Sequence, residues 1–323
     1  MKARVLINFE EGVLHEDAIN MLSDIADLVF KPSTEEEFKN ELSSADALLL
    51  DLKPITAELV SIAERLKIIA RYGVGYDNVD VEACSKRGVY VTITPNVLSD
   101  AVADLTLAMM LALARNLLKA DKHTRTCWGK GVEFSLGVDL KDKKLGIIGA
   151  GRIGLQVAKK AKGFGMEILY YDVVRKREME EDFEAKFVDL EYLLRNSDFV
   201  SIHTPLNENT RGMIGEKELN LMKPTAYLIN TARGPIIDQD ALIKVLKEGK
   251  IAGAGLDVYE EEPLPLDNPL TQLDNVLLTP HIGSATLETR RAMAVKAAKN
   301  IVSALKGEVP PDLVPEQAHL RSK

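Results

Sequence analysis

The first hundred residues of the chain alternate short apolar runs with amphipathic segments. The runs are RVLINF, ALLLD, KIIARYG and VYVTIT, and the segments EDAINMLSDIA, TAELVSIAERL and DVEACSKRG between them have a helical pattern. In TEEEFKNEL, Thr34 precedes Glu37 with the spacing of a capping box, which predicts a further short helix. Strands that alternate with helices predict a parallel sheet flanked by helices.

A second alternating series begins at KKLGIIG and continues with EILYYD, AKFVDL, DFVSIHT, AYLINTA, IAGAGLDV and NVLLTP. These runs are apolar throughout, as in strands that are covered on both faces. Ahead of the series, SDAVADLTLAMMLALARNLL (residues 99–118) predicts one long helix, apolar on nearly every side of its middle and therefore buried between layers. After the series, TLETRRAMAVKAAKNIVSAL predicts a last helix before a proline-rich, polar tail.

Length and composition fit a globular protein of two domains. A chain of 323 residues exceeds the size at which a single core stops growing, and 46% apolar with 28% charged residues is an ordinary globular balance. We therefore expect an α/β protein with two doubly wound parallel-sheet domains. The formal net charge of -8 argues against a nucleic-acid partner.

The sequence also indicates a cytoplasmic protein without a membrane partner. The most apolar stretch, Leu105 to Ala114, is ten residues long, whereas a membrane-spanning helix needs about 20. The N-terminus reaches charge again at Glu10, too soon for the apolar region of a secretory signal. Cys84 and Cys127 have no partner motif and fit reduced structural thiols better than a disulfide, a redox site or a metal site.

Three glycines after the run KKLGII have the spacing of a dinucleotide-binding turn. Gly149 permits the tight turn, Gly151 lets the backbone approach a pyrophosphate, and Gly154 allows a helix to pack closely. Backbone N–H groups at Arg152 and Ile153, where that helix begins, would face the phosphates. Because strand, turn and helix occur in order, we prefer this interpretation to three unrelated turn glycines.

An acidic residue, Asp172, ends the next apolar run, where a carboxylate would bind the adenosine ribose. The same carboxylate would repel a 2′-phosphate, so NAD is the expected cofactor and NADP is less favoured. Arg175, Lys176 and Arg177 follow closely and could partly offset that repulsion.

Ligands of open α/β sheets bind beyond the carboxyl ends of the strands, so the residues that close the second series of strands are candidate site residues. They are His203, Thr204, Pro205, Thr231, Ala232, Arg233, Asp257, Pro280 and His281. An arginine, an acidic cluster and a histidine at one sheet edge suit the reduction of a 2-oxo acid. That reaction needs a cation for the carboxylate and a proton donor for the developing alkoxide.

Arg233 is the candidate for the carboxylate, because its planar fork pairs with carboxylates in bidentate fashion. His281 is the candidate acid, and a glutamate of the EEEP run would favour its protonated form. Each group also has a structural interpretation: a turn arginine in a surface ion pair, a hydrogen-bonded histidine at a strand end, and a solvated acidic loop. For His203 the structural interpretation is stronger, because it precedes the Thr204–Pro205 turn, which fits the adenosine side of a dinucleotide site.

Over nearly its whole length the chain resembles the D-isomer-specific 2-hydroxyacid dehydrogenases. The matching motifs are RYGVGYDNVD, TPNVLSDAVADLTLAMML, GIIGAGRIG, INTARGPIID, AGLDVYEEEPLP and TPHIGSAT. The resemblance implies two similar α/β domains, with an NAD-binding Rossmann domain at residues 98–285 inserted into a substrate domain of residues 1–97 plus 286–323. It also implies a cleft that closes by domain motion. A homodimer is expected, with its contact near the long helix that starts at Ser99.

The resemblance assigns the catalytic roles to Arg233, Glu262 and His281, and it places Asp257 against the nicotinamide carboxamide. Backbone N–H groups around Val74 and Gly75 would bind the substrate carboxylate with Arg233, and His281 would also contact the substrate. Besides the glycine turn and Asp172, the implied cofactor contacts are Thr204, Pro205, Thr210, Thr231, Ala232, Gly283 and Ser284.

Within the family, TPNVLSDAVAD, AKGFGMEILYY and HIGSATLETR are most similar to the glyoxylate, hydroxypyruvate and 2-ketogluconate reductases. The expected activity is NAD(H)-dependent reduction of small 2-oxo acids, such as glyoxylate and hydroxypyruvate, to D-2-hydroxy acids. Many of those reductases use NADPH, and Asp172 departs from that pattern. The alternative enzyme is 3-phosphoglycerate dehydrogenase, suggested by NAD preference, Arg71 and Asn96, although LLLDLKPIT lacks the arginine of that enzyme's loop. An alternative of another class is a non-catalytic, NADH-sensing protein similar to corepressors of this fold, which the complete catalytic set disfavours.

Overall fold

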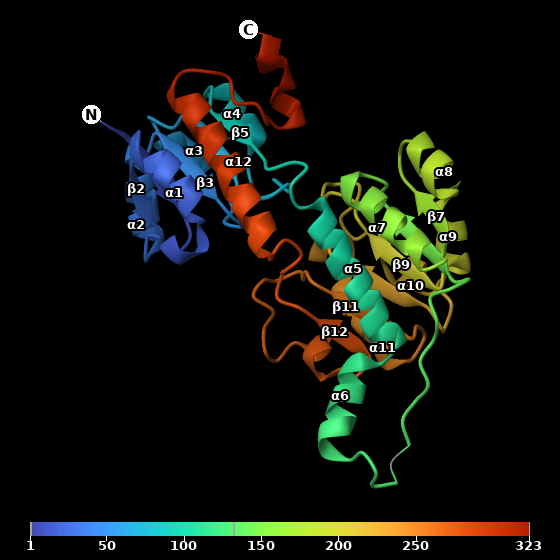
Figure 1. The fold of residues 1–323 in the computed structure, drawn as a ribbon. Coiled ribbons are helices and arrows are strands. Elements are labelled where there is room, and N and C mark those ends of the chain that lie inside the picture. Colours follow the sequence, from blue (N-terminus) through green and yellow to red (C-terminus); the bar gives the residue numbers. More distant parts are fainter. Residues whose placement is uncertain (1, 132, 323) are drawn as a thin grey trace. The chain divides into compact units, whose positions relative to one another are not determined.

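The computed structural model describes residues 2–131 and 133–322 and divides the chain into two compact units (Figure 1). The first unit comprises residues 1–98 and 284–323, and the second comprises residues 99–283. Each unit contains one parallel sheet flanked by helices, which confirms the predicted fold class. The chain crosses into the second unit after Leu98 and returns to the first after Gly283.

The sheet of the first unit has the strand order β2-β1-β3-β4-β5, with every neighbouring pair parallel. This order is that of flavodoxin-like folds. The strands are β1 (Ala3–Ile7), β2 (Ala26–Phe30), β3 (Ala47–Leu50), β4 (Ile68–Arg71) and β5 (Tyr90–Thr92). The sequence did not predict β2. It is an edge strand in which only Ala26 is buried, so its apolar pattern is weak.

The helices of the first unit come from both ends of the chain. They are α1 (Glu16–Ser23), α2 (Glu35–Ser44), α3 (Ala57–Ile62), α4 (Val81–Lys86) and α12 (Leu287–Leu305). The late helix α12 packs against α1 and against β4. The expected cap of α2 is present, because Thr34 Oγ1 accepts the Glu37 N–H at 3.1 Å and the Glu37 carboxylate accepts the Ser33 N–H at 2.6 Å.

The polar C-terminal tail is anchored to the sheet of the first unit. It forms a 3-10 helix, η4 (Pro315–Ser322), in which Gln317 is completely buried. The Gln317 amide accepts the Val91 N–H at 2.7 Å and donates to the Val89 carbonyl at 2.9 Å and the Ser85 hydroxyl at 3.0 Å. The tail therefore continues the hydrogen bonding of β5.

The sheet of the second unit has the order β12-β11-β10-β9-β6-β7-β8, again with parallel neighbours. It is the Rossmann order extended by one strand. The strands are β6 (Lys144–Ile148), β7 (Glu167–Tyr171), β8 (Lys186–Phe187), β9 (Phe199–Ile202), β10 (Tyr227–Asn230), β11 (Gly253–Leu256) and β12 (Val276–Leu278). The run AKFVDL was predicted as a buried strand, but β8 has only two residues and both are exposed.

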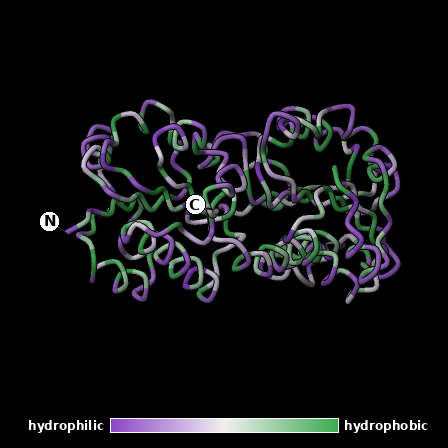
Figure 2. The backbone as a smooth tube through the Cα atoms, turned by 90° about the horizontal axis from the view of Figure 1, so that it is seen from above, coloured by the Kyte–Doolittle hydropathy of each residue, from purple (hydrophilic) through white to green (hydrophobic). Residues whose placement is uncertain are grey.

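Helices cover both faces of this second sheet. They are α5 (Ser99–Ala114), α6 (Leu117–Thr126), α7 (Arg152–Gly163), α8 (Arg177–Phe183), α9 (Leu190–Asn196), α10 (Glu216–Leu219) and α11 (Gln239–Lys247). One apolar core lies under α5 and α7, and a second lies under α9 and α11. Figure 2 shows the apolar segments running through the middle of each unit.

The prediction of a single long helix over residues 99–118 is wrong, because α5 ends at Ala114 and α6 begins at Leu117. Asn116 has a φ of 51°, a left-handed conformation that ends a helix and that asparagine tolerates better than most residues. The axes of α5 and α6 differ by 54°. No single helix in the described part of the chain has the length and apolarity to span a membrane, although this bent pair meets those criteria together.

Candidate functional site

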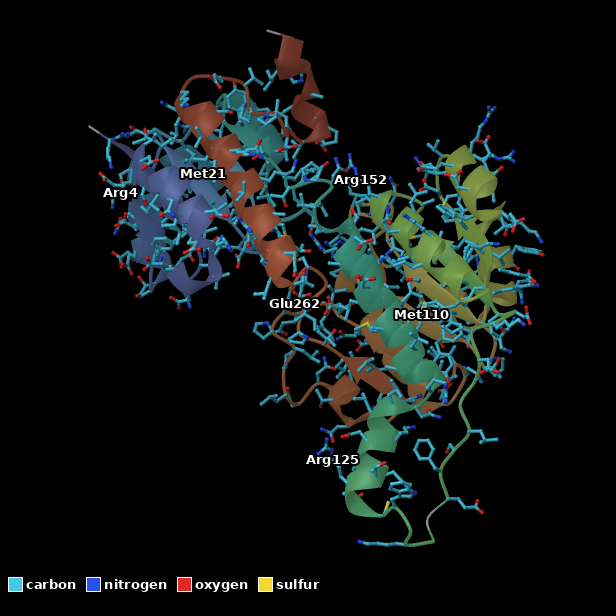
Figure 3. All side chains as sticks on the ribbon, in the orientation of Figure 1. Arg4, Met21, Met110, Arg125, Arg152 and Glu262 are labelled. Carbon is cyan, nitrogen blue, oxygen red and sulfur yellow. The ribbon has the colours of Figure 1, made fainter. Side chains whose placement is uncertain are left out.

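The turn between β6 and α7 leaves room beside the N-terminus of α7. Gly149 has a φ of 96°, and a Cβ there would lie 2.7 Å from the carbonyl carbon of His203. A Cβ on Gly154 would lie 2.2 Å from the Gly149 oxygen, so the helix lies directly on the turn. Nothing occupies the space within 4 Å of a Cβ built on Gly151. A pyrophosphate could therefore reach the N-terminus of α7, where Arg152 lies (Figure 3).

Asp172 follows β7 and is held beside this turn. Its Oδ2 accepts the Ala150 N–H at 2.8 Å, and its Oδ1 accepts the Val174 N–H at 3.1 Å. The carboxylate is half-buried. It is therefore fixed next to the glycine turn at the carboxyl end of the sheet, where a ribose hydroxyl could donate to it.

Two enclosed polar atoms lie after β9. His203 Nδ1 and Thr204 Oγ1 are buried and have no hydrogen-bond partner within the described residues. The other ring nitrogen of His203 lies 2.8 Å from the Ser201 hydroxyl, and burial lowers the pKa of His203 to about 3, so the ring is neutral. Buried polar atoms are normally satisfied, so this place suits a polar ligand. Together with the glycine turn and Asp172, it fits a dinucleotide.

Two other expected cofactor residues make bonds within the second unit. Thr210 Oγ1 donates to the Pro205 carbonyl at 2.6 Å and accepts the Asn207 N–H at 2.9 Å, which closes the turn after β9. The Thr231 hydroxyl lies 3.0 Å from the hydroxyl of Thr106 on α5. These contacts fix the loops that surround the carboxyl ends of β9 and β10.

Arg233 lies in a loop after β10 that is braced by Asn230. The Asn230 amide donates to the Arg233 carbonyl at 2.8 Å and accepts the Ala232 N–H at 3.0 Å. A Cβ on the next residue, Gly234, would lie 1.9 Å from the carbonyl carbon of Tyr259. Only a glycine lets this loop lie directly against the loop that follows β11, which carries Glu262.

Glu262 and His281 are brought together although 19 positions separate them. Glu262 Oε2 lies 2.7 Å from His281 Nδ1, and Glu262 Oε1 accepts the Tyr259 N–H at 3.1 Å. Burial alone would raise the pKa of Glu262. The hydrogen bond and charge of His281, with the charge of Arg233, outweigh burial and hold that pKa below its usual value. The carboxylate is thus ionised and aimed at the imidazole.

Asp257 accepts hydrogen bonds from the segment that carries His281. Its side chain is 1% exposed, and Oδ1 accepts bonds from the Thr279 hydroxyl at 2.6 Å and the Ile282 N–H at 2.8 Å. Oδ2 accepts the Gly283 N–H at 2.8 Å. Burial raises the pKa of Asp257, and these bonds oppose part of the rise. His281 itself has a φ of 53°, an uncommon conformation for a residue with a side chain, and the fixed segment sustains it.

The sequence analysis did not identify a role for Tyr259, which connects the segments that follow β11 and β12. Its hydroxyl donates to the carbonyl of Leu256 at 3.0 Å or of Thr279 at 2.9 Å, so it links the ends of β11 and β12. Burial raises the pKa of Tyr259 to about 12, so the hydroxyl stays protonated near neutral pH. The run DVYEEEP does not predict this role, because a tyrosine between apolar and acidic residues fits either a core or a surface position.

The expected site residues are divided between the units. Val74 and Gly75 follow β4 in the first unit, where they are half-buried, and Ser284 is the first residue after the chain returns there. The remaining expected site residues belong to the second unit, at the carboxyl ends of β6, β7, β9, β10, β11 and β12.

The fold and the site define a dinucleotide-binding α/β enzyme with an arginine, a glutamate and a histidine at the carboxyl edge of its sheet. A family model described as "D-isomer specific 2-hydroxyacid dehydrogenase, NAD binding domain" matches residues 107–283. The chain belongs to this family, as the sequence motifs indicated.

Known relatives are similar to this chain over most of its length. A glyoxylate reductase of Thermococcus litoralis is 54% identical over 281 residues, which is 85% of each chain. The structure is similar to that of a D-lactate dehydrogenase of Aquifex aeolicus complexed with NAD and lactic acid, with a TM-score of 0.88, 32% identity and coverage of 96% and 98%. It is also similar to an NADPH-dependent glyoxylate/hydroxypyruvate reductase of Sinorhizobium meliloti in complex with NADP and malonate, with a TM-score of 0.86, 28% identity and 98% coverage of both chains.

Proposed function

We propose that the protein reduces small 2-oxo acids, glyoxylate and hydroxypyruvate first among them, to D-2-hydroxy acids with NADH. The observation that carries this proposal is the 2.7 Å contact between Glu262 and His281, in a loop arrangement that abuts the Arg233 loop. A carboxylate that favours a protonated imidazole, next to an arginine, is the arrangement that reduction of a 2-oxo acid requires. The glyoxylate reductase relative supports the choice of substrate.

The residues of the set have different tasks in the reaction. The bound nicotinamide cofactor supplies the hydride. Arg233 binds the substrate carboxylate, and His281 donates a proton to the carbonyl oxygen. Glu262 orients that imidazole through its Nδ1 and places a negative charge beside it. Asp257 acts through the His281 segment that it holds, in addition to the expected contact with the nicotinamide carboxamide.

We propose NADH rather than NADPH because of Asp172. Its carboxylate is fixed by two backbone N–H groups and would face the adenosine ribose, where it accepts hydroxyl donors and repels a 2′-phosphate. Thr204 and the N-terminus of α7 would hold the rest of the dinucleotide, and Gly283 and Ser284 would complete the site near the nicotinamide.

The test is an NADH oxidation assay with glyoxylate, hydroxypyruvate, 2-ketogluconate and 3-phosphohydroxypyruvate. We expect turnover with the small acids and a loss of about 10²–10⁴-fold in kcat for His281→Ala, the usual contribution of a general acid. Arg233→Ala should mainly raise KM for the oxo acid. The exposed His319→Ala serves as a control and should retain parental turnover.

Three outcomes would contradict the proposal. Parental turnover in both the His281→Ala and Arg233→Ala variants would remove these residues from the reaction. A strong preference for 3-phosphohydroxypyruvate would favour a phosphoglycerate dehydrogenase. Tight NADH binding without turnover on any of these acids would favour a dinucleotide-sensing protein.

We also propose a homodimer, on the basis of an exposed apolar surface on and after α6. We call it the arm surface and define it by Leu117, Leu118, Trp128, Phe134, Leu136 and Val138. Trp128 is 76% exposed and Leu136 is 96% exposed, and α6 buries no residue of its own. A concentration of large apolar side chains on a surface is typical of a protein interface. We place the contact on α6 and the segment after it, next to the expected region at α5, which packs against α7 and the sheet.

A further inference from the structure

The ion pair between Arg175 and Glu180 lies just beyond the ribose-binding carboxylate of the second unit. Arg175 is three positions after Asp172, and Glu180 lies on α8, which packs beside β8. Arg175 Nε lies 2.7 Å from Glu180 Oε1, and Nη2 lies 2.6 Å from Oε2. This is a bidentate pair, in which the planar guanidinium spends two donors on one carboxylate.

The Glu180 carboxylate is held by a second hydrogen bond, from Tyr170 of β7. The Tyr170 hydroxyl donates to Glu180 Oε1 at 2.7 Å and accepts the Lys176 N–H at 3.0 Å. The Tyr170 ring is completely buried and packs on Phe187 with a centroid distance of 5.3 Å. Hydrogen bonds from Arg175 and Tyr170 lower the pKa of Glu180 to about 2, so the partner of Arg175 is ionised at any working pH.

From this geometry we infer that Glu180 is a specificity-determining residue, which withholds Arg175 from the 2′-phosphate of NADPH. The inference rests on the proposed binding of a dinucleotide with its ribose at Asp172. Arg175 is the first cation after Asp172 and is 65% exposed, so its guanidinium could serve a 2′-phosphate if it were released. Glu180 removes that option while Asp172 repels the phosphate directly. Asp172, by direct repulsion, and Glu180, by occupying Arg175, would then both favour NADH over NADPH.

The experiment measures the dissociation constants of NADH and NADPH by isothermal titration calorimetry, without any oxo acid. For Glu180→Gln we expect tighter NADPH binding by roughly three- to tenfold, the scale of one exposed bidentate ion pair, and unchanged NADH binding. The control is Glu184→Gln, which removes an equal charge whose partner is Lys162, at 2.7 Å, and should leave both constants unchanged.

A second variant separates release of Arg175 from simple loss of negative charge. If Glu180 acts through Arg175, the gain in NADPH binding should vanish in the double variant Glu180→Gln with Arg175→Met. An equal gain with and without Arg175 would overturn the inference, because it would be a general charge effect. So would an unchanged preference in Glu180→Gln. Failure of the parent protein to bind either dinucleotide would instead contradict the proposed function, and this inference with it.

Discussion

The carboxylate of Glu262 is directed at His281 by its own backbone surroundings. One oxygen accepts the Tyr259 N–H, which leaves the other to meet the imidazole at 2.7 Å. The hydrogen bond and charge of His281 lower the pKa of Glu262, so the carboxylate is ionised where it meets the imidazole. A proton on that ring is what reduction of a carbonyl consumes.

Glu262→Gln should therefore move the pH dependence of the reductase reaction. The amide keeps the size of the side chain but removes the negative charge beside the imidazole, which favours a positively charged proton donor. We expect the alkaline limb of kcat/KM for glyoxylate to shift down by about one pH unit, which corresponds to about 1.4 kcal/mol. The control is Glu260→Gln, in the same acidic run, where the carboxylate instead accepts the Gln239 N–H. A profile identical to that of the parent would return Glu262 to a structural role.

The sequence could locate this residue only in part. Periodicity and strand ends placed Arg233, Asp257 and His281 at one sheet edge, but nothing local distinguishes Glu262 from Glu260 and Glu261. The resemblance to the family made that choice. In physical terms the distinction depends on a bond from Tyr259 and on a histidine from another strand, and neither is visible in a linear pattern.

The loops after β10 and β11 function as one element because they touch without side chains between them. Gly234 provides that contact, since its Cβ position lies 1.9 Å from the carbonyl carbon of Tyr259 and 2.5 Å from the Glu260 nitrogen. The atoms in the way belong to the backbone, so a side chain there must push one loop away from the other. The position of Arg233 relative to Glu262 depends on this glycine.

Gly234→Ala should therefore reduce activity strongly while the fold survives. A displacement of about 1 Å in a catalytic group can cost about 10²-fold in rate, and we expect a loss in kcat/KM of that order. Circular dichroism would show that the secondary structure is kept, and NADH titration would show that the glycine turn before α7 still binds the cofactor. Gly163→Ala at the exposed end of α7, where a Cβ meets nothing within 4 Å, is the matched control. Parental activity in Gly234→Ala would show that the two loops move independently.

Elements with strong local signals were predictable, and elements set by tertiary contacts were not. Helix α7 spans Arg152–Gly163 as the glycine turn indicated, because its start depends on local backbone chemistry. The break between α5 and α6 was missed because apolar periodicity continues through it, and a left-handed Asn116 leaves no apolar signature. Strand β8 was overestimated, since an edge strand of two exposed residues depends on its neighbour rather than on its own sequence.

At the scale of the whole molecule, the connectivity places His281 two residues before the return to the first unit after Gly283. Asp257 accepts bonds from the N–H groups of Ile282 and Gly283, so one carboxylate holds both the segment that carries His281 and the point where the chain returns. The other notable feature at this scale is the arm surface, whose apolar side chains have no cover within the described residues of the second unit. A second copy of the chain is the cover that we propose.

If the protein is a homodimer that forms through the arm surface, a polar substitution there should lower its mass in solution. Leu136 is almost fully exposed and lies in a segment without regular structure, so Leu136→Asp should leave the folded unit intact. If it lies in the interface, a buried unpaired charge should cost about 2–4 kcal/mol and raise the dimer dissociation constant by roughly 30- to 1,000-fold. Sedimentation velocity over a range of concentrations measures this directly. Leu287→Asp is the control, because Leu287 is 86% exposed at the start of α12, outside the arm surface. A parent that sediments as a monomer at high micromolar concentration, or a Leu136→Asp variant that dimerises as the parent does, would contradict the proposed interface.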